Sequence, residues 1–128
     1  MSEIQPIDLE QIAKAILQLQ KHIQWKPQKA NPHLAKRIRL GHLPKNSTMA
    51  EYQELIRQVI TDVKAKVYVY VYGTAIYPTI TSVIKDQLWL VMLGIDGILE
   101  TAFPPEDPSS YLGSPSFIYL ETLENLLK

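Results

Sequence analysis

Alternating positions along residues 66–103 predict four short strands in succession. Val67, Val69 and Val71 alternate with three tyrosines, which is the period-two pattern of a pleated strand. Residues 88–95 are almost continuously apolar, as expected for a strand that is buried on both faces. Turn residues separate the apolar runs, so we expect antiparallel strands at about 66–72, 76–84, 87–95 and 98–103.

Two local signals describe the connections in this predicted sheet. Asp96-Gly97 lies between apolar residues and predicts a two-residue type I′ hairpin, a turn that needs positive φ at both central positions. Pro78 has no backbone N–H to donate, so we expect the second strand at a sheet edge, or bulged near this residue. Together the four strands predict an antiparallel meander.

Helical spacing of apolar residues dominates the chain before the sheet. Asp8, with Gln11 three residues later, predicts the start of a first helix that fades near Trp25. Thr48 and Glu51 match a capping box and predict the start of another helix, with its apolar stripe facing the sheet. These helices precede the strands, so the pattern predicts an α+β fold with the helices on one sheet face.

Two shorter segments also read as helix. Asn31 is a suitable N-cap for a helix over residues 32–40, and Gly41 is a suitable left-handed residue just past its end. After an acidic loop rich in proline and serine, apolar residues recur at helical spacing and predict a C-terminal helix over residues 116–127.

Length and composition narrow the class of protein. The chain has 128 residues, so we expect residues 1–128 to form a single domain. It has no cysteine, which excludes disulfides and thiolate metal sites. The 13 basic and 13 acidic residues cancel, which does not favour a globally basic protein that coats nucleic acid. No signal pattern or spanning stretch is present, so we expect a cytoplasmic protein without membrane contact.

The charges are nevertheless unevenly distributed. Residues 21–45 carry lysine and arginine but no acidic residue, whereas residues 96–124 carry six acidic residues and no basic one. Within the basic segment, His33 and Arg37 are four residues apart and share a helix face, with Lys36 beside them. A histidine can take a proton from a ribose hydroxyl, and an arginine can stabilise charge on a phosphate. The spacing alone is more typical of a capping or packing histidine on a solvated basic helix.

The order of these features resembles the barnase–EndoU–colicin–RelE-like superfamily of small nucleases, in particular its phage-type members. The shared features are an H-x-x-x-R element on a helix, a further helix, and a four-stranded meander with a D-G hairpin and a threonine on its last strand. The matching stretches are residues 33–37 (HLAKR), 52–63 and 89–103, where GIDGILETAF carries most of the family character. The resemblance covers roughly residues 31–105.

The resemblance implies a metal-independent endoribonuclease of the toxin or effector type, which cleaves RNA by 2′-hydroxyl transesterification without a cofactor. It implies RNA as a partner, or an acidic protein such as an antitoxin or immunity protein. The catalytic residues carried over by position are His33, Arg37 and Thr101. We expect the basic segment to supply RNA-binding residues, namely Lys36, Arg39 and His42. His42 is nine residues from His33, so it joins the site only if the chain turns at Gly41.

Two alternatives remain open at this point. The first is a non-catalytic binding or regulatory module of similar fold, whose basic segment 21–45 contacts an acidic partner or nucleic acid. The second concerns Tyr68, Tyr70 and Tyr72, which share one strand face and could stack bases. Helices more commonly cover such a face, and we expect that arrangement here.

Overall fold

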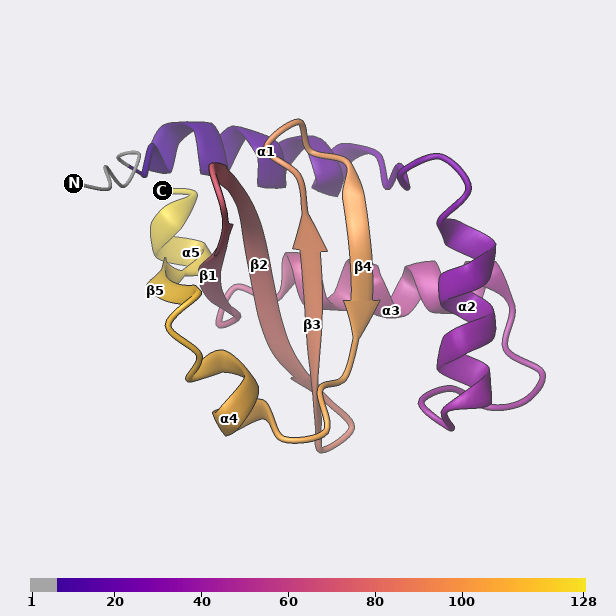
Figure 1. Cartoon of the computed structure of the whole chain (residues 1–128). Coiled ribbons are helices and arrows are strands. Elements are labelled where there is room, and N and C mark those ends of the chain that lie inside the picture. Colours follow the sequence, from indigo (N-terminus) through magenta and orange to yellow (C-terminus); the bar gives the residue numbers. More distant parts are fainter. Residues whose placement is uncertain (1–6) are drawn as a thin grey trace.

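The computed structural model describes residues 7–128, which form one sheet with helices before and after it (Figure 1). Within this part of the chain the sheet has five antiparallel strands in the order β4-β3-β2-β1-β5. The helices are α1 (Leu9–Lys21), α2 (Ala30–Arg39), α3 (Met49–Thr61), α4 (Pro108–Leu112) and α5 (Leu123–Leu126). The strands are β1 (Lys66–Tyr72), β2 (Ala75–Ile84), β3 (Gln87–Leu93), β4 (Leu99–Phe103) and β5 (Phe117–Thr122). The predicted α+β class and the meander of the first four strands are confirmed.

The caps of α1 and α3 follow the sequence signals. Asp8 caps α1, and its carboxylate accepts hydrogen bonds from the backbone N–H groups of Glu10 and Gln11. Thr48 and Glu51 form a complete capping box at α3. These contacts satisfy N–H groups that have no partner inside the first turn of a helix.

Helix α2 begins earlier than predicted, so the assignment of Asn31 as its N-cap is wrong. The helix starts at Ala30, with Lys29 as N-cap and no side-chain cap. Pro32 then lies in the first turn, where a missing N–H costs no intrahelical hydrogen bond. The predicted end is confirmed, because Gly41 has a φ of 76° just past the last turn.

The two-residue type I′ hairpin occurs at Lys85-Asp86 and not at Asp96-Gly97. Both Lys85 and Asp86 have positive φ, and they join β2 to β3 directly. At the other connection only Gly97 has positive φ, and the Asp96 carboxylate accepts a hydrogen bond from the N–H of Ile98. That side-chain contact favours a longer loop. Within this loop the N–H of Gly97 donates a hydrogen bond to the carbonyl of Gly94.

Pro78 lies at a boundary within β2, a strand that has neighbours on both sides. It is in register with Val69 of β1, whereas the pairing of β2 with β3 begins one residue later, at Thr79. Strand β2 is therefore interior rather than an edge strand, and the proline occupies the part of it that has one partner.

The predicted C-terminal helix over residues 116–127 is wrong. Residues 117–122 form β5, which pairs antiparallel with β1, and only the short α5 follows. The pattern is in fact alternating: Phe117 and Tyr119 lie on one face, while Ile118 packs against the main core on the other. Because both sets are apolar, the period of two is masked.

The two faces of the sheet differ. One face carries Val69, Ile80, Trp89 and Val91, which join α1 and α3 in a single buried cluster. Figure 1 shows α3 running behind the sheet and α2 standing beside β4. We call the opposite face the tyrosine face. It carries the tyrosines of β1 and the residues of the other four strands that lie on the same side of the sheet. Its members are Tyr68, Tyr70, Tyr72, Tyr77, Thr79, Met92, Thr101, Phe103, Phe117 and Tyr119.

Helices α1 and α3 leave the tyrosine face free, so the expectation that helices would cover it holds only for one part. There α4 lies on the face, with the ring of Tyr111 5.6 Å from Phe103 and 5.3 Å from Phe117. Tyr72 is 68% exposed and Tyr119 is 48% exposed. The rings contact one another: Tyr70 lies 4.9 Å from Phe117 and 6.4 Å from Tyr72, measured between ring centroids. The result is an aromatic surface that is accessible around Tyr72 and Tyr119.

Candidate functional site

His33 and Thr101 meet at the margin of the tyrosine face. His33 is half-buried on α2, and its Nδ1 lies 3.4 Å from the Thr101 hydroxyl on β4. The Trp25 ring stacks on the imidazole, with centroids 5.4 Å apart and an interplanar angle of 24°. Packing on one side and a hydroxyl on another fix the orientation of the imidazole ring. Two of the three residues predicted to be catalytic are thus brought together.

Burial and neighbouring cations hold the pKa of His33 below its ordinary value. Partial burial is the largest cause, followed by the positive charges of Arg37, Lys29 and Lys36. A hydrogen bond with the backbone of Glu100 acts in the opposite direction. The net effect leaves the imidazole neutral near pH 7, and a neutral imidazole has one nitrogen free to accept a proton.

A pocket of about 430 Å³ opens at this pair of residues. Its walls come from α2, from the segment before it, and from β1, β2, β3 and β4. The lining residues are Lys29, His33, Tyr70, Tyr72, Tyr77, Met92, Glu100 and Thr101. It therefore combines a neutral imidazole, a hydroxyl, an exposed lysine and three tyrosine rings.

Arg37 lies in a neighbouring pocket and is buried. Arginine residues are mostly exposed in proteins, but this one is only 4% exposed. Its guanidinium carbon lies 5.4 Å from the centroid of the Phe103 ring, on the last residue of β4. Within residues 7–128 no carboxylate lies within ion-pair distance of Arg37, and its buried Nε has no hydrogen-bond partner. Such a cation is costly to bury without an anion.

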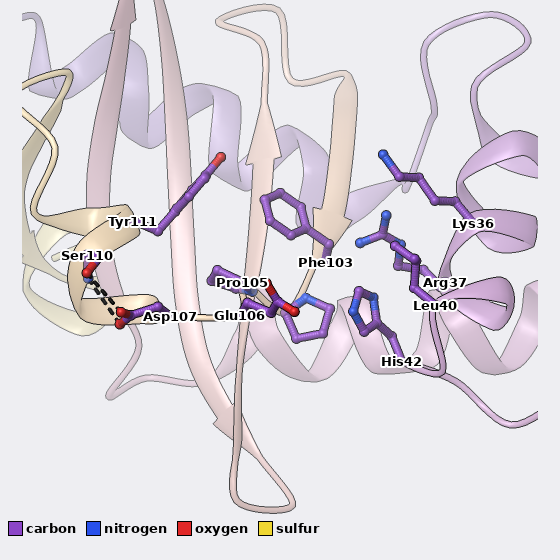
Figure 2. Close-up of a pocket in the computed structure, with 11 residues that line it drawn as sticks. Lys36, Arg37, Leu40, His42, Phe103, Pro105, Glu106, Asp107, Ser110 and Tyr111 are labelled. Atoms are coloured by element: carbon purple, nitrogen blue, oxygen red, sulfur yellow. Dashed lines mark hydrogen bonds between the residues drawn. The ribbon is translucent and has the colours of Figure 1, made fainter.

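The pocket that contains Arg37 measures about 650 Å³ (Figure 2). Lys36, Leu40 and His42 line it from the side of α2, and Phe103 and the buried Pro104 and Pro105 line it from the end of β4. Glu106, Asp107, Ser110 and Tyr111 complete it. Figure 2 shows Lys36 and Arg37 extending from α2 toward Phe103, with Asp107 and Ser110 on the far side.

The chain turns at Gly41, and the turn brings His42 to the pocket of Arg37 and not to the pocket of His33. The N–H of His42 donates to the carbonyl of Arg37 at 2.8 Å, which closes the end of α2 and brings the two side chains to one site. Burial and the charges of Arg37 and Lys36 lower the pKa of His42, while Glu106 raises it. Arg39, the remaining predicted RNA-binding residue, is exposed and lines neither pocket.

Several residues of the site were missed by sequence reasoning. The sequence marks Trp25 only as the end of the first helix and does not distinguish Lys29 from the other basic residues of segment 21–45. The alternation on β1 predicts that the tyrosines share one face of the strand. It does not predict which of the two faces the helices cover. Among residues 7–128 no group of three or more His, Asp or Glu could hold a metal ion.

No match was found when the chain was compared with protein-family models, with curated proteins and with solved structures. None of the helices in residues 7–128 is long and apolar enough to cross a membrane.

Proposed function

We propose that this protein is a metal-independent endoribonuclease whose reacting centre is the His33–Thr101 pair. The observation that carries the proposal is the contact between a neutral, oriented imidazole and a hydroxyl, at a pocket open to an accessible aromatic face. The unmatched positive charge of Arg37 lies four residues along the same helix face and supports a polyanionic substrate.

In this mechanism His33 removes the proton from a ribose 2′-hydroxyl. The 2′-oxygen forms a bond to phosphorus as the bond from phosphorus to the 5′-oxygen breaks, and the 5′-oxygen takes up a proton. Lys29 and Tyr77 line the same pocket and can donate that proton or stabilise negative charge on the phosphate. Thr101 positions the imidazole. The products are a 2′,3′-cyclic phosphate and a free 5′-hydroxyl.

The tyrosine face suits a single-stranded substrate. Unpaired bases stack on aromatic rings of an exposed sheet, whereas a duplex keeps its bases inside. Tyr72 is the most accessible of these rings and lines the pocket that contains His33. Stacking there would place a strand across the sheet with its backbone toward α2.

The test is incubation of the purified chain with single-stranded RNA in EDTA. We expect cleavage, with 2′,3′-cyclic phosphate at the new ends. His33→Ala should lower the rate by about 10²- to 10⁴-fold, the range of general acid–base catalysis. His22→Ala is the matched control, because His22 is exposed at the end of α1 and lines no pocket of the site. RNA that stays intact at high protein concentration rules out the nuclease for the isolated chain.

A second candidate function is RNA binding without cleavage. The placement of His33 and His42 in separate pockets favours it, because a nuclease that uses two histidines needs both at one phosphate. In that case RNA binds with a strong salt dependence, stays intact, and is released when charges in residues 21–45 are reversed.

A further inference from the structure

The pocket around Arg37 is a distinct site that the reaction at His33 does not use. Arg37 and His33 are four residues apart on α2, so they are displaced by about 6 Å along the helix axis. That displacement is on the order of the step between neighbouring phosphates in an extended strand. We propose that this pocket binds a neighbouring nucleotide of the RNA strand, with its phosphate held by Arg37, Lys36 and His42.

The first observation that supports this proposal is that two basic side chains of the pocket have buried nitrogen atoms without a hydrogen-bond partner. Arg37 is 4% exposed, and neither a carboxylate ion pair nor a hydrogen bond to its Nε is found within residues 7–128. His42 likewise has a buried Nδ1 without a hydrogen-bond partner. Buried polar groups of native proteins are almost always paired, so two orphaned groups in one pocket indicate a ligand.

The second support is the chemistry of the opposing walls. Guanidinium groups bind phosphate through two parallel N–H groups, and Lys36 adds a second positive charge at the mouth. Phe103 and Tyr111 contribute apolar rings, 5.6 Å apart between centroids, against which a base can pack. The volume of about 650 Å³ lies within the usual range for small-molecule sites and accommodates a mononucleotide.

The two carboxylates of the pocket differ in position: Asp107 lies on the side opposite α2, whereas Glu106 is near enough to His42 for its charge to raise the pKa of that imidazole. Asp107 is the N-cap of α4, and its carboxylate accepts hydrogen bonds from the N–H and the hydroxyl of Ser110. Glu106 is exposed and can accept a hydrogen bond from an exocyclic amino group of a base. The phosphate therefore binds on the α2 side of the pocket, with the base directed toward Tyr111.

The inference rests on the proposed function only in naming RNA as the ligand, so its test does not need cleavage. Cytidine 5′-monophosphate and cytidine are titrated separately into the ¹⁵N-labelled His33→Ala variant. We expect the nucleotide to shift amide signals of residues 36–42 and 103–111, and the nucleoside to bind about 10- to 100-fold more weakly, as the loss of charged hydrogen bonds predicts.

Arg37→Met removes the charge while keeping most of the side-chain volume, and it should weaken nucleotide binding by a similar factor. Arg57→Met is the matched control, because Arg57 lies on α3 beside Glu54 and lines neither pocket. Thermal unfolding establishes that both variants are folded. Equal affinity for nucleotide and nucleoside, or unchanged nucleotide affinity in folded Arg37→Met, would overturn the proposal.

A second experiment, which measures cleavage, separates the proposed nucleotide site from the proposed nuclease activity. A dinucleotide that fills only the reacting centre is compared with oligonucleotides that add one phosphate on the 5′ or the 3′ side. The wild-type chain should prefer one of the longer substrates, and Arg37→Met should abolish that preference. If RNA is not cleaved but nucleotide binding depends on Arg37, the nuclease fails and the nucleotide site stands. If cleavage occurs without any such preference, the nucleotide site fails alone.

Discussion

At the scale of single residues, Tyr52 connects the helical layer to the strand that carries Thr101. Its side chain is fully buried on α3, and its hydroxyl donates to the backbone carbonyl of Ala102 on β4. Burial raises the pKa of this phenol above its ordinary range, so the hydroxyl remains a donor at any working pH. The aromatic ring also lies 5.6 Å from Trp25, the residue that stacks on His33.

Tyr52→Phe should therefore destabilise the fold. The substitution leaves a buried carbonyl without its donor, which costs about 1–3 kcal/mol. Urea unfolding measures the difference. Tyr119→Phe is the matched control: Tyr119 is 48% exposed, and its change should stay within about 0.5 kcal/mol. Equal effects of the two substitutions would show that the Tyr52 hydroxyl contributes nothing beyond packing.

The lowered pKa values of His33 and His42 predict a pH dependence of stability. The unfolded chain takes up protons as the pH falls below about 6.5, whereas both imidazoles in the folded protein resist protonation. Because the unfolded state binds more protons in this window, stability rises with pH. This contribution is complete above about pH 6.5 and is lost as the pH falls below that value toward the folded pKa.

Unfolding free energies measured between about pH 7.5 and pH 5.5 check this expectation, in a range above the ordinary carboxylate pKa values. The wild-type chain should lose stability as the pH falls. The double variant His33→Ala/His42→Ala should show a flatter profile. An equally steep profile in the double variant would assign the dependence to other groups.

The position of His33 and Arg37 on one face of α2 was predictable from the sequence, but the burial of Arg37 was not. Helical spacing places the two residues on one face and places the apolar residues Leu34 and Ile38 beside them, where they would be expected to pack against the sheet. In the fold both of these apolar residues are only partly buried, and Arg37 contacts the Phe103 ring instead. Phe103 comes from the far end of the meander, and local spacing carries no information about that contact.

At the scale of elements, the end of α2 decides whether His42 reaches the pocket. Gly41 has a φ of 76°, a conformation that side chains with a Cβ adopt at a cost. No atom lies within 4 Å of a Cβ built at this position, so the cost is conformational and not steric. The reversal that follows Gly41 brings His42 back beside Arg37.

Gly41→Ala should lower stability by about 1 kcal/mol, and Gly41→Asn by less, because asparagine tolerates the left-handed region. If the pocket binds a nucleotide, Gly41→Ala should also weaken that binding, since the backbone relaxes and His42 moves. Urea unfolding and nucleotide titration measure the two effects. A substitution that costs no stability would show that the left-handed turn is not required in solution.

The helices before the sheet and the strands up to residue 103 were predictable, because each is marked by an apolar pattern and by a boundary residue. Helix α4 was not, because it lies in the segment that was expected to form an acidic loop. Residues 117–122 have neither a distinct apolar pattern nor a boundary residue. Phe117 and Tyr119 meet the aromatic rings of β1, while Ile118 packs against the main core. Both faces are apolar, so the segment satisfies a helical and a strand spacing alike. The edge of β1 supplies the hydrogen-bond partners that favour the strand.

At the scale of the whole molecule, the sequence predicts a sheet with helices but not which face the helices cover. Aliphatic and aromatic residues alternate on β1, and either set could have packed against α1 and α3. The valines do so, which leaves the tyrosines for the opposite face. Aliphatic side chains fit closely between helices, while tyrosine keeps its hydroxyl near water. That choice produces the surface on which the proposed function depends.

The burial of Leu90 on the tyrosine face leads to a prediction about the stability of the whole fold. Leu90 lies opposite the helices, in register with Thr81 and Phe103, and it is fully buried although it is outside the main cluster. Leu90→Ala should cost about 2–5 kcal/mol, as for a leucine with no access to solvent. Leu93→Ala, on the helical side, should cost a similar amount.

If both faces belong to one cooperative unit, each variant should unfold in a single transition with an unchanged denaturant slope. Fluorescence of the two tryptophans and far-ultraviolet circular dichroism should then report the same midpoint in urea. A loss below about 1 kcal/mol for Leu90→Ala would show that the layer on the tyrosine face adds little to stability. A second transition confined to this variant would show that residues 104–113 detach from the sheet before it unfolds.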